Sequence, residues 1–244
     1  MSPRARTGLF AVSAAGLGAL LLWAVAGLQD FGRYHHRYGI LLNHVAVSER
    51  HATNVVTSIV FDYRGFDTLG EEFILFASAV GVALLLREVR DDAPQPRDRL
   101  VSDPVGLVGI GFAAALFTIG LYIVAHGPIT PGGGFQGGVV LAAAIAIVFL
   151  AGNYRAYRRV APLPAVDFLE GTGAGGYVVI GIVSMLLGSA FLHNFGPFGA
   201  AGTLASAGSI SFLNVATALE VFAAFVLLFT EFLEELVVAR AEPE

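Results

Sequence analysis

Long apolar stretches constrain this chain of 244 residues more than any other feature of its sequence. A helix of about 20 residues crosses a hydrocarbon core of about 30 Å, because each residue adds about 1.5 Å. Hydrophobic residues make up 56% of the chain and charged residues 14%, whereas soluble domains contain about 25% charged residues. The sequence therefore predicts an all-α, polytopic membrane protein with six transmembrane helices, at residues 8–28, 69–86, 105–125, 133–151, 175–192 and 212–238.

Three of these spans carry further signals at their ends. The fourth has to include a glycine-rich stretch, because residues 139–151 alone are too short to cross a bilayer. The third begins at Asp103 and Pro104, which suit the N-cap and the first helical position. The first span, preceded by Arg4 and Arg6, resembles a signal peptide that ends at Ala24-Val25-Ala26. Its apolar stretch exceeds the usual 7 to 15 residues of a signal peptide, which favours a retained span.

Arginine placement predicts the orientation of the spans. All 14 basic residues are arginine, and short cytoplasmic loops carry the excess of positive charge. Ten of the 14 fall on one side if both termini are cytoplasmic, whereas the connections at residues 126–132 and 193–211 contain none. We therefore expect cytoplasmic N- and C-termini.

Several kinds of chemistry are excluded or disfavoured by residue content. The chain has no cysteine, which excludes disulfides, iron–sulfur clusters and cysteine-type zinc sites. Its histidines show no paired metal-ligand spacing, and no G-x-S-x-G nucleophile motif is present. We therefore expect no cofactor, no metal site and no enzymatic activity of its own, and no binding of nucleic acid.

The first connection and the second divide the chain. Apolar residues recur at helical spacing between Ala52 and Tyr63, which predicts a short amphipathic helix, either in the membrane interface, against a partner, or over the mouth of the bundle. Pro94 and Pro96 lie in a charged run that marks a linker. We predict a first module at residues 1–93 with two spans, a linker at 94–103, and a second module at 104–244 with four spans.

Ionisable residues inside spans are costly, so each is a functional candidate. Asp67 and Glu71 stand four residues apart where the second span begins, and on one helix both would face the same way. Such a pair can pass a proton or hold a desolvated cation. The alternative is structural, because Thr68-Leu-Gly-Glu71 fits a capping box and Arg64 could pair with Asp67.

Two acidic residues lie in the last span. Glu220 is too deep to reach the interface easily, so it is either a proton or cation relay or a structural hydrogen-bonding group. Glu231, with Glu234 and Glu235, lies towards the cytoplasmic end, which favours a solvated helix end.

The segment from His126 to Gly138 is the most unusual of the chain. Glycine costs about 1 kcal/mol relative to alanine inside a helix, so tandem glycines indicate close backbone approach. The pairs Gly133/Gly137 and Gly134/Gly138 are both spaced for tight helix packing. A set of free amides facing an ion path is the alternative. Nucleotide binding is disfavoured, because the segment lacks the GK[ST] end of a P-loop.

Two motifs resemble known families. The string His126-Gly-Pro-Ile-Thr-Pro131-Gly132-Gly133-Gly134-Phe135-Gln136-Gly137-Gly138 resembles the signature of the MnhB/MrpB family, small subunits of the Mrp-type multisubunit Na⁺/H⁺ antiporter. The stretch from Asn54 to Glu72 resembles the C-terminal part of the large MrpA subunit, equivalent to the MbhE subunit of membrane-bound hydrogenases. Together the resemblances cover about residues 30–90 and 100–238.

The resemblance implies an accessory or ion-path subunit of a monovalent cation/proton antiporter in a prokaryotic plasma membrane. It implies large antiporter-like subunits as partners, because this chain has no lysine for their kind of proton relay. The lipid bilayer, Na⁺ and protons complete the expected partners. By position, Asp67 and Glu71 fall on the acidic pair that the family associates with the cation path, whereas Glu220 is matched less securely.

Two alternatives remain open at this stage. The same modules could serve a redox-driven relative of respiratory complex I, such as a membrane-bound hydrogenase. The chain could also be a scaffold that only packs larger subunits.

Overall fold

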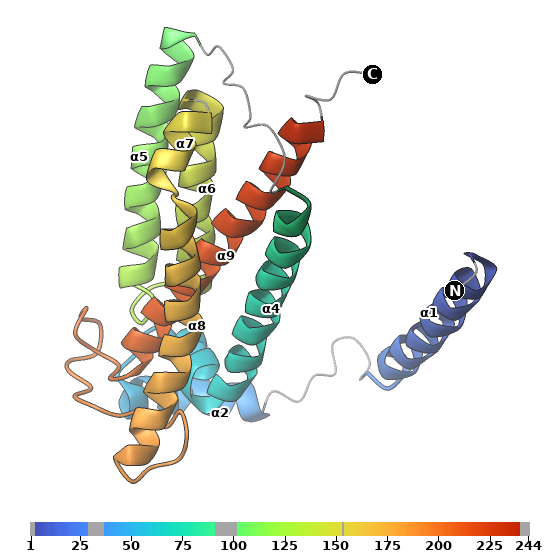
Figure 1. Cartoon of the computed structure of the whole chain (residues 1–244). Coiled ribbons are helices and arrows are strands. Elements are labelled where there is room, and N and C mark those ends of the chain that lie inside the picture. The colour runs from blue at the N-terminus through green and yellow to red at the C-terminus, as the bar shows by residue number, and fades with distance from the viewer. Residues whose placement is uncertain (1–2, 29–36, 91–101, 153, 240–244) are drawn as a thin grey trace. The chain divides into compact units, whose positions relative to one another are not determined.

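The computed structural model describes residues 3–28, 37–90, 102–152 and 154–239, and those residues form helices and connections without any strand. Six of the helices are long and apolar enough to cross a membrane. The predicted all-α fold with six transmembrane helices is therefore confirmed. The linker at residues 94–101 and His35 and His36 lie outside the described residues. In chain order (Figure 1) the helices are α1 (Pro3–Ala26), α2 (Arg37–Arg50), α3 (Val55–Ser58), η1 (Ile59–Tyr63), α4 (Gly65–Arg90), α5 (Asp103–Ala125), α6 (Gly134–Gly152), α7 (Tyr154–Val160), α8 (Leu163–Leu186) and α9 (Ile210–Ala239).

The chain separates into two compact units, residues 1–41 and 42–244. The first unit contains α1, whose apolar side chains are exposed along its whole length, as Trp23 and Phe10 illustrate. Apolar side chains on every side of a helix suit a membrane span. Helix α2 begins in this unit and continues into the second.

The second unit is a bundle of α4, α5, α6, α8 and α9. Helix α9 packs against α4, α6 and α8, and α5 packs mainly against α6 (Figure 1). Consequently α9 is the most buried of the six spans. The described polar side chains of α9 from Asn214 to Glu234 are buried within this chain, whereas α5 exposes most of its apolar surface.

The predicted amphipathic helix exists as α3 and the π-helical turn η1, but its buried face differs from the apolar one. Val56 is exposed, whereas the polar residues Thr57 and Ser58 are buried. Thr57 donates from its hydroxyl to the Gly127 carbonyl at 2.8 Å. The face that packs on the bundle is therefore mixed, because Phe61 is also buried there while Thr57 satisfies a carbonyl of the loop after α5.

The start of the fifth span was predicted wrongly. Helix α8 begins at Leu163 rather than near residue 175, so it includes Asp167 and Glu170. Its buried residues are spaced three or four apart over its whole length: Val166, Glu170, Gly173, Ala174, Tyr177, Gly181 and Ser184. Two carboxylates interrupt the apolar run at the start of α8 without interrupting the helix.

Glycines allow α5, α6 and α9 to pack closely. A Cβ on Gly134 would lie 2.2 Å from the Asn214 carbonyl oxygen of α9, and one on Gly137 would lie 2.4 Å from Val124 Cγ2 of α5. Gly133 precedes the helix and has a φ of +150°, a conformation that favours glycine. The tandem glycines thus lie at positions where α6 has no room for side chains.

Candidate functional site

Two deeply buried glutamates lie on facing helices in the middle of the bundle. Glu72 of α4 is 1% exposed and Glu220 of α9 is 0% exposed. Their carboxyl groups are close enough to interact, and Thr217, one turn before Glu220, lies beside Glu72. Neither oxygen of Glu220 has a hydrogen-bond partner of ordinary geometry among the described residues. Such burial is costly, so this pair is a functional candidate.

Asp67 and Glu71 occupy a different face of α4. Both are exposed, and Asp67 accepts a hydrogen bond from Arg64 at 2.6 Å. The capping-box interpretation is wrong, because α4 begins at Gly65 and the Thr68 hydroxyl donates to the Val60 carbonyl instead. The predicted pair therefore points out of the described bundle, and its neighbour Glu72 points in.

A third buried carboxyl lies one helical turn from Glu220. Glu170 of α8 is 3% exposed, and its Oε1 has no hydrogen-bond partner in the described part of the chain. Gly173 brings the two helices together, because a Cβ there would lie 2.4 Å from the Glu220 backbone nitrogen. Residues three apart on a helix share a face and differ by about 4.5 Å in height. Glu170 therefore adds a third buried carboxyl group beside Glu72 and Glu220. We call these three residues the carboxyl line.

Beyond Glu170 the line reaches an ion-pair cluster on three helices. Arg87 of α4 donates from Nε to Glu231 of α9 at 2.6 Å, and from its two terminal nitrogens to Asp167 of α8 at 2.9 and 3.1 Å. Glu231 is 0% exposed. The expectation that Glu231 lies at a solvated helix end is therefore wrong, since α4 and α8 cover that part of α9.

Polar contacts continue past this cluster to the end of the bundle. Tyr154 donates to Glu234 at 2.6 Å, and Arg158 lies 3.6 Å from the same carboxylate. The short helix α7 thus places an arginine and two tyrosines against α9. Burial raises the pKa of Tyr157, which lies outside the spans, to about 12. Its hydroxyl therefore stays protonated and contacts Thr230 and the Val226 carbonyl of α9.

In the other direction, polar groups lead from Glu72 towards the opposite end of α4. Tyr177 of α8 donates to the Gly65 carbonyl at 3.0 Å. Asp62, outside the spans, is ion-paired with Arg50 and accepts a hydrogen bond from the Asn194 backbone. Burial raises the pKa of Asp62, against the lowering effect of the Arg50 guanidinium.

The loop of the glycine motif is fastened by Asn54 of the first connection. The Asn54 amide group donates to the carbonyls of Gly127 and Thr130, each at 2.8 Å. The Asn54 backbone N–H donates to the Pro128 carbonyl at 3.1 Å. Asn214 of α9 donates to the Val124 carbonyl from the other side. The motif is thus bound by residues of the first connection and of α9, and its carbonyls are largely occupied by protein donors.

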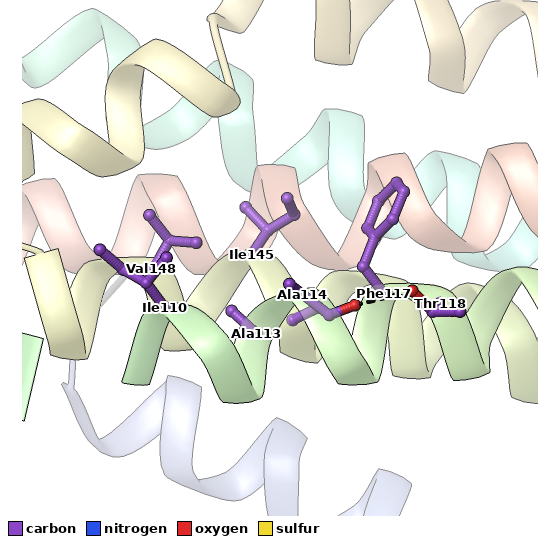
Figure 2. Close-up of a pocket in the computed structure, with 8 residues that line it drawn as sticks. Ile110, Ala113, Ala114, Phe117, Thr118, Ile145 and Val148 are labelled. Carbon is purple, nitrogen blue, oxygen red and sulfur yellow. Dashed lines mark hydrogen bonds between the residues drawn. The ribbon is translucent and has the colours of Figure 1, made fainter. Parts of the chain in front are cut away.

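Two other features bear on what the site can do. A groove of about 380 Å³ between α5 and α6 is lined by apolar side chains and Thr118, whose hydroxyl bonds to the Ala114 carbonyl (Figure 2). It contains no ionisable group, so it is not a candidate for the site. Over the described ranges, no three histidine, aspartate or glutamate side chains are grouped as metal ligands.

The sequence thus predicted Glu220 as a candidate among these buried carboxyl groups, but it did not predict Glu72 or Glu170. A single spacing, four residues between Asp67 and Glu71, does not say which face of α4 turns inward. Val166, Gly173 and Tyr177 recur at helical spacing with Glu170. This pattern could have indicated that Glu170 lies on the buried face of α8.

Family comparisons match most of the chain. The family model of MbhE, a subunit of MBH, matches residues 3–98. A family model described as a domain related to the MnhB subunit of Na⁺/H⁺ antiporter matches residues 107–227.

Two relatives match over different lengths. An uncharacterized protein of Methanocaldococcus jannaschii is 29% identical over 240 residues, which cover 87% of this chain and 86% of the relative. A Na⁺/H⁺ antiporter subunit of Bacillus subtilis is 34% identical over 92 residues, 36% of this chain and 61% of the relative.

Two solved structures share the fold. A chain of the membrane-bound sulfane sulfur reductase, an archaeal respiratory membrane complex, is 27% identical with a TM-score of 0.73, covering 94% of this chain and 98% of its own length. A chain of the Mrp complex from Dietzia sp. DQ12-45-1b is 24% identical with a TM-score of 0.67, and the match covers this whole chain but only 27% of the longer one. The present chain therefore combines an MbhE domain with a domain related to the MnhB subunit of Na⁺/H⁺ antiporters.

Proposed function

We propose that this chain is an accessory, ion-path subunit of an Mrp-type multisubunit antiporter that exchanges Na⁺ for protons. The observation that carries the proposal is the facing pair Glu72 and Glu220, buried between α4 and α9 within the membrane-spanning bundle. The family match to an antiporter subunit supports this assignment. The complex would reside in the plasma membrane of a prokaryotic cell, with both termini of this chain in the cytoplasm.

The chemistry of the pair is proton exchange. Two carboxylates at close range repel each other, so we expect the pair to hold at least one proton. Glu72 and Glu220 could then release and rebind that proton as a cation or a second proton approaches. Because the chain has no lysine, the driving relay would lie in the larger partner subunits.

Asp67 and Glu71 belong to this proposal at the outer surface of α4. Their exposure on a span suggests that another subunit covers them in the complex. We propose that Asp67 and Glu71 transfer the cation or proton across that subunit interface. In this proposal the chain has a first module at residues 1–93, a linker at 94–103 and a second module at 104–244.

The proposal is tested with the co-expressed complex in vesicles, by measuring Na⁺-induced pH change normalised to the amount of complex. Glu220→Gln removes the charge and the titration while keeping the size of the side chain, so we expect at least a tenfold loss of flux. Asp103→Asn is the matched control, because it makes the same change at an exposed position at the start of α5. Wild-type flux in Glu220→Gln would contradict the ion-path role.

Asp67→Asn and Glu71→Gln are measured in the same assay. We expect a steep loss of flux for at least one of them while the complex still assembles. Wild-type flux in both would remove the outer pair from the path and leave Glu72 and Glu220 as its carboxyl groups.

A second candidate function is membership of a redox-driven respiratory complex. It is favoured by the match to a chain of the sulfane sulfur reductase complex along 98% of that chain's length. The two functions separate by their driving force. Proton movement that requires Na⁺ favours the antiporter, and proton movement that requires an electron donor and acceptor favours the redox complex.

A further inference from the structure

A pocket of about 220 Å³ opens between α4 and α8 beside the carboxyl line. Phe76, Val80, Ala83 and Leu84 of α4 and Leu227 of α9 form its apolar wall, and Arg87, Asp167, Glu170 and Gly171 complete its lining. The volume has room for several water molecules. Polar partners for such water are present on one side only, at Arg87, Asp167 and Glu170.

Glu170 connects the surface of this pocket with the interior of the bundle. The residue lines the pocket, is 3% exposed, and has an Oε1 without a partner among the described atoms. An unpartnered buried carboxyl oxygen costs free energy, and rotation of the Glu170 carboxyl group towards water in the pocket would offset that cost. Glu170 therefore points to water as the ligand of this pocket.

The geometry of α8 joins Glu170 to Glu220. Gly173 allows the α8 backbone to touch the α9 backbone at Glu220, and Glu170 lies one turn away on the same face. Among the described residues of α8, no other buried carboxyl group lies between the pocket and Glu220 of α9. A proton that reaches Glu170 thus has Glu220 as its next buried acceptor.

The charges around Glu170 come from all three helices. Arg87 of α4 is held by Asp167 and Glu231, Asp167 stands one turn from Glu170 on α8, and Glu220 lies on α9. These pairs hold the guanidinium against Asp167 and Glu231 in the lining of the pocket. Arg87 therefore fixes these two carboxylates in place beside Glu170.

We propose that this pocket is the opening through which water delivers protons to the buried pair, with Glu170 as the intermediate carrier. Hydronium in the pocket gives its proton to the Glu170 carboxylate and leaves as water. Glu170 then gives the proton to the Glu220 carboxylate and returns to its ionised form. The inference rests on the proposed function. It adds the route by which Glu72 and Glu220 receive protons from the end of the bundle that carries Arg87, Arg155 and Arg158.

The absence of cysteine from the chain allows a direct test. Gly171→Cys places a thiol in the pocket lining, and Gly175→Cys is the matched control one turn further along α8. Both glycines have open space where a Cβ would stand. The complexes are treated in vesicles with a charged, membrane-impermeant thiosulfonate, and each variant is compared with itself before and after treatment.

We expect Gly171→Cys to be modified and its Na⁺-induced proton flux to fall at least fivefold, while the flux of treated Gly175→Cys and of the treated cysteine-free chain is unchanged. Glu170→Gln should lower flux at least fivefold without loss of the complex. Failure to modify Gly171→Cys, or modification without loss of flux, overturns the pocket as the opening.

Glu220→Gln in the same vesicles separates the two proposals. If Glu220→Gln abolishes flux while modified Gly171→Cys and Glu170→Gln retain it, the ion-path function stands and the route through the pocket is wrong. If Glu220→Gln retains flux, the proposed function itself fails.

Discussion

The two sides of α9 use close helix packing for different purposes. Towards α6, glycines such as Gly134 and Gly138 bring backbones together, and the Asn214 amide group there donates to the Val124 carbonyl. Towards α4 and α8, Gly173 does the same, yet the residues brought together are Glu72, Glu170 and Glu220. Small residues set the distance between helices, and the side chains beside them decide whether the contact is structural or chemical.

The largest effect on stability is expected from the ion-pair cluster on the carboxyl side. Arg87→Leu removes the counter-charge of Glu231, which is 0% exposed, and of Asp167. Removing one partner of a buried pair costs about 3 to 5 kcal/mol, and the partial exposure of Arg87 places the loss near the lower value. The thermal midpoint of the purified chain in detergent should fall clearly. The double variant Arg87→Leu/Glu231→Leu should recover part of it, and a double variant less stable than the single one would contradict the pairing.

A smaller loss is expected from the glycine side. A Cβ on Gly134 would lie 2.2 Å from the Asn214 carbonyl oxygen, so Gly134→Ala forces α6 away from α9. Overpacking of this kind costs about 1 to 3 kcal/mol. Gly111→Ala is the control, because nothing lies within 4 Å of its Cβ position on α5. Equal thermal midpoints for the two variants would show that the α6–α9 contact is looser than described.

The smallest effect is expected at Tyr157, where α7 meets α9. Tyr157→Phe removes a hydroxyl that contacts Thr230 and the Val226 carbonyl, which should cost about 1 kcal/mol at neutral pH. The pKa of this phenol is raised to about 12, so the folded state holds the proton more tightly than the unfolded state. Its stabilising contribution is therefore present below pH 10 and is lost as the pH rises towards 12. The stability difference between wild type and Tyr157→Phe should shrink over that interval; a constant difference would contradict burial of the hydroxyl.

The six helices could be predicted because long apolar runs are a property of each segment alone. The start of α8 was missed because Asp167 and Glu170 interrupt its apolar run. Glu72 faces Glu220 because of the way α4 is rotated about its axis against α9. This rotation is a tertiary property, and the spacing of Asp67 and Glu71 does not predict it. The glycine spacing did indicate close packing, although the polar fastening by Asn54 comes from a residue more than 70 positions away along the chain.

The measurement that tests the account most directly is a double-variant comparison of the buried pair. Na⁺-induced proton flux is recorded for Glu72→Gln, Glu220→Gln and the double variant in vesicles, each normalised to assembled complex. If the two carboxyl groups act as one proton-holding unit, each single variant loses at least tenfold and the double variant loses little more than either, since residues that act together are not additive. Wild-type flux in either single variant, or two losses that multiply in the double variant, would contradict a shared site between α4 and α9.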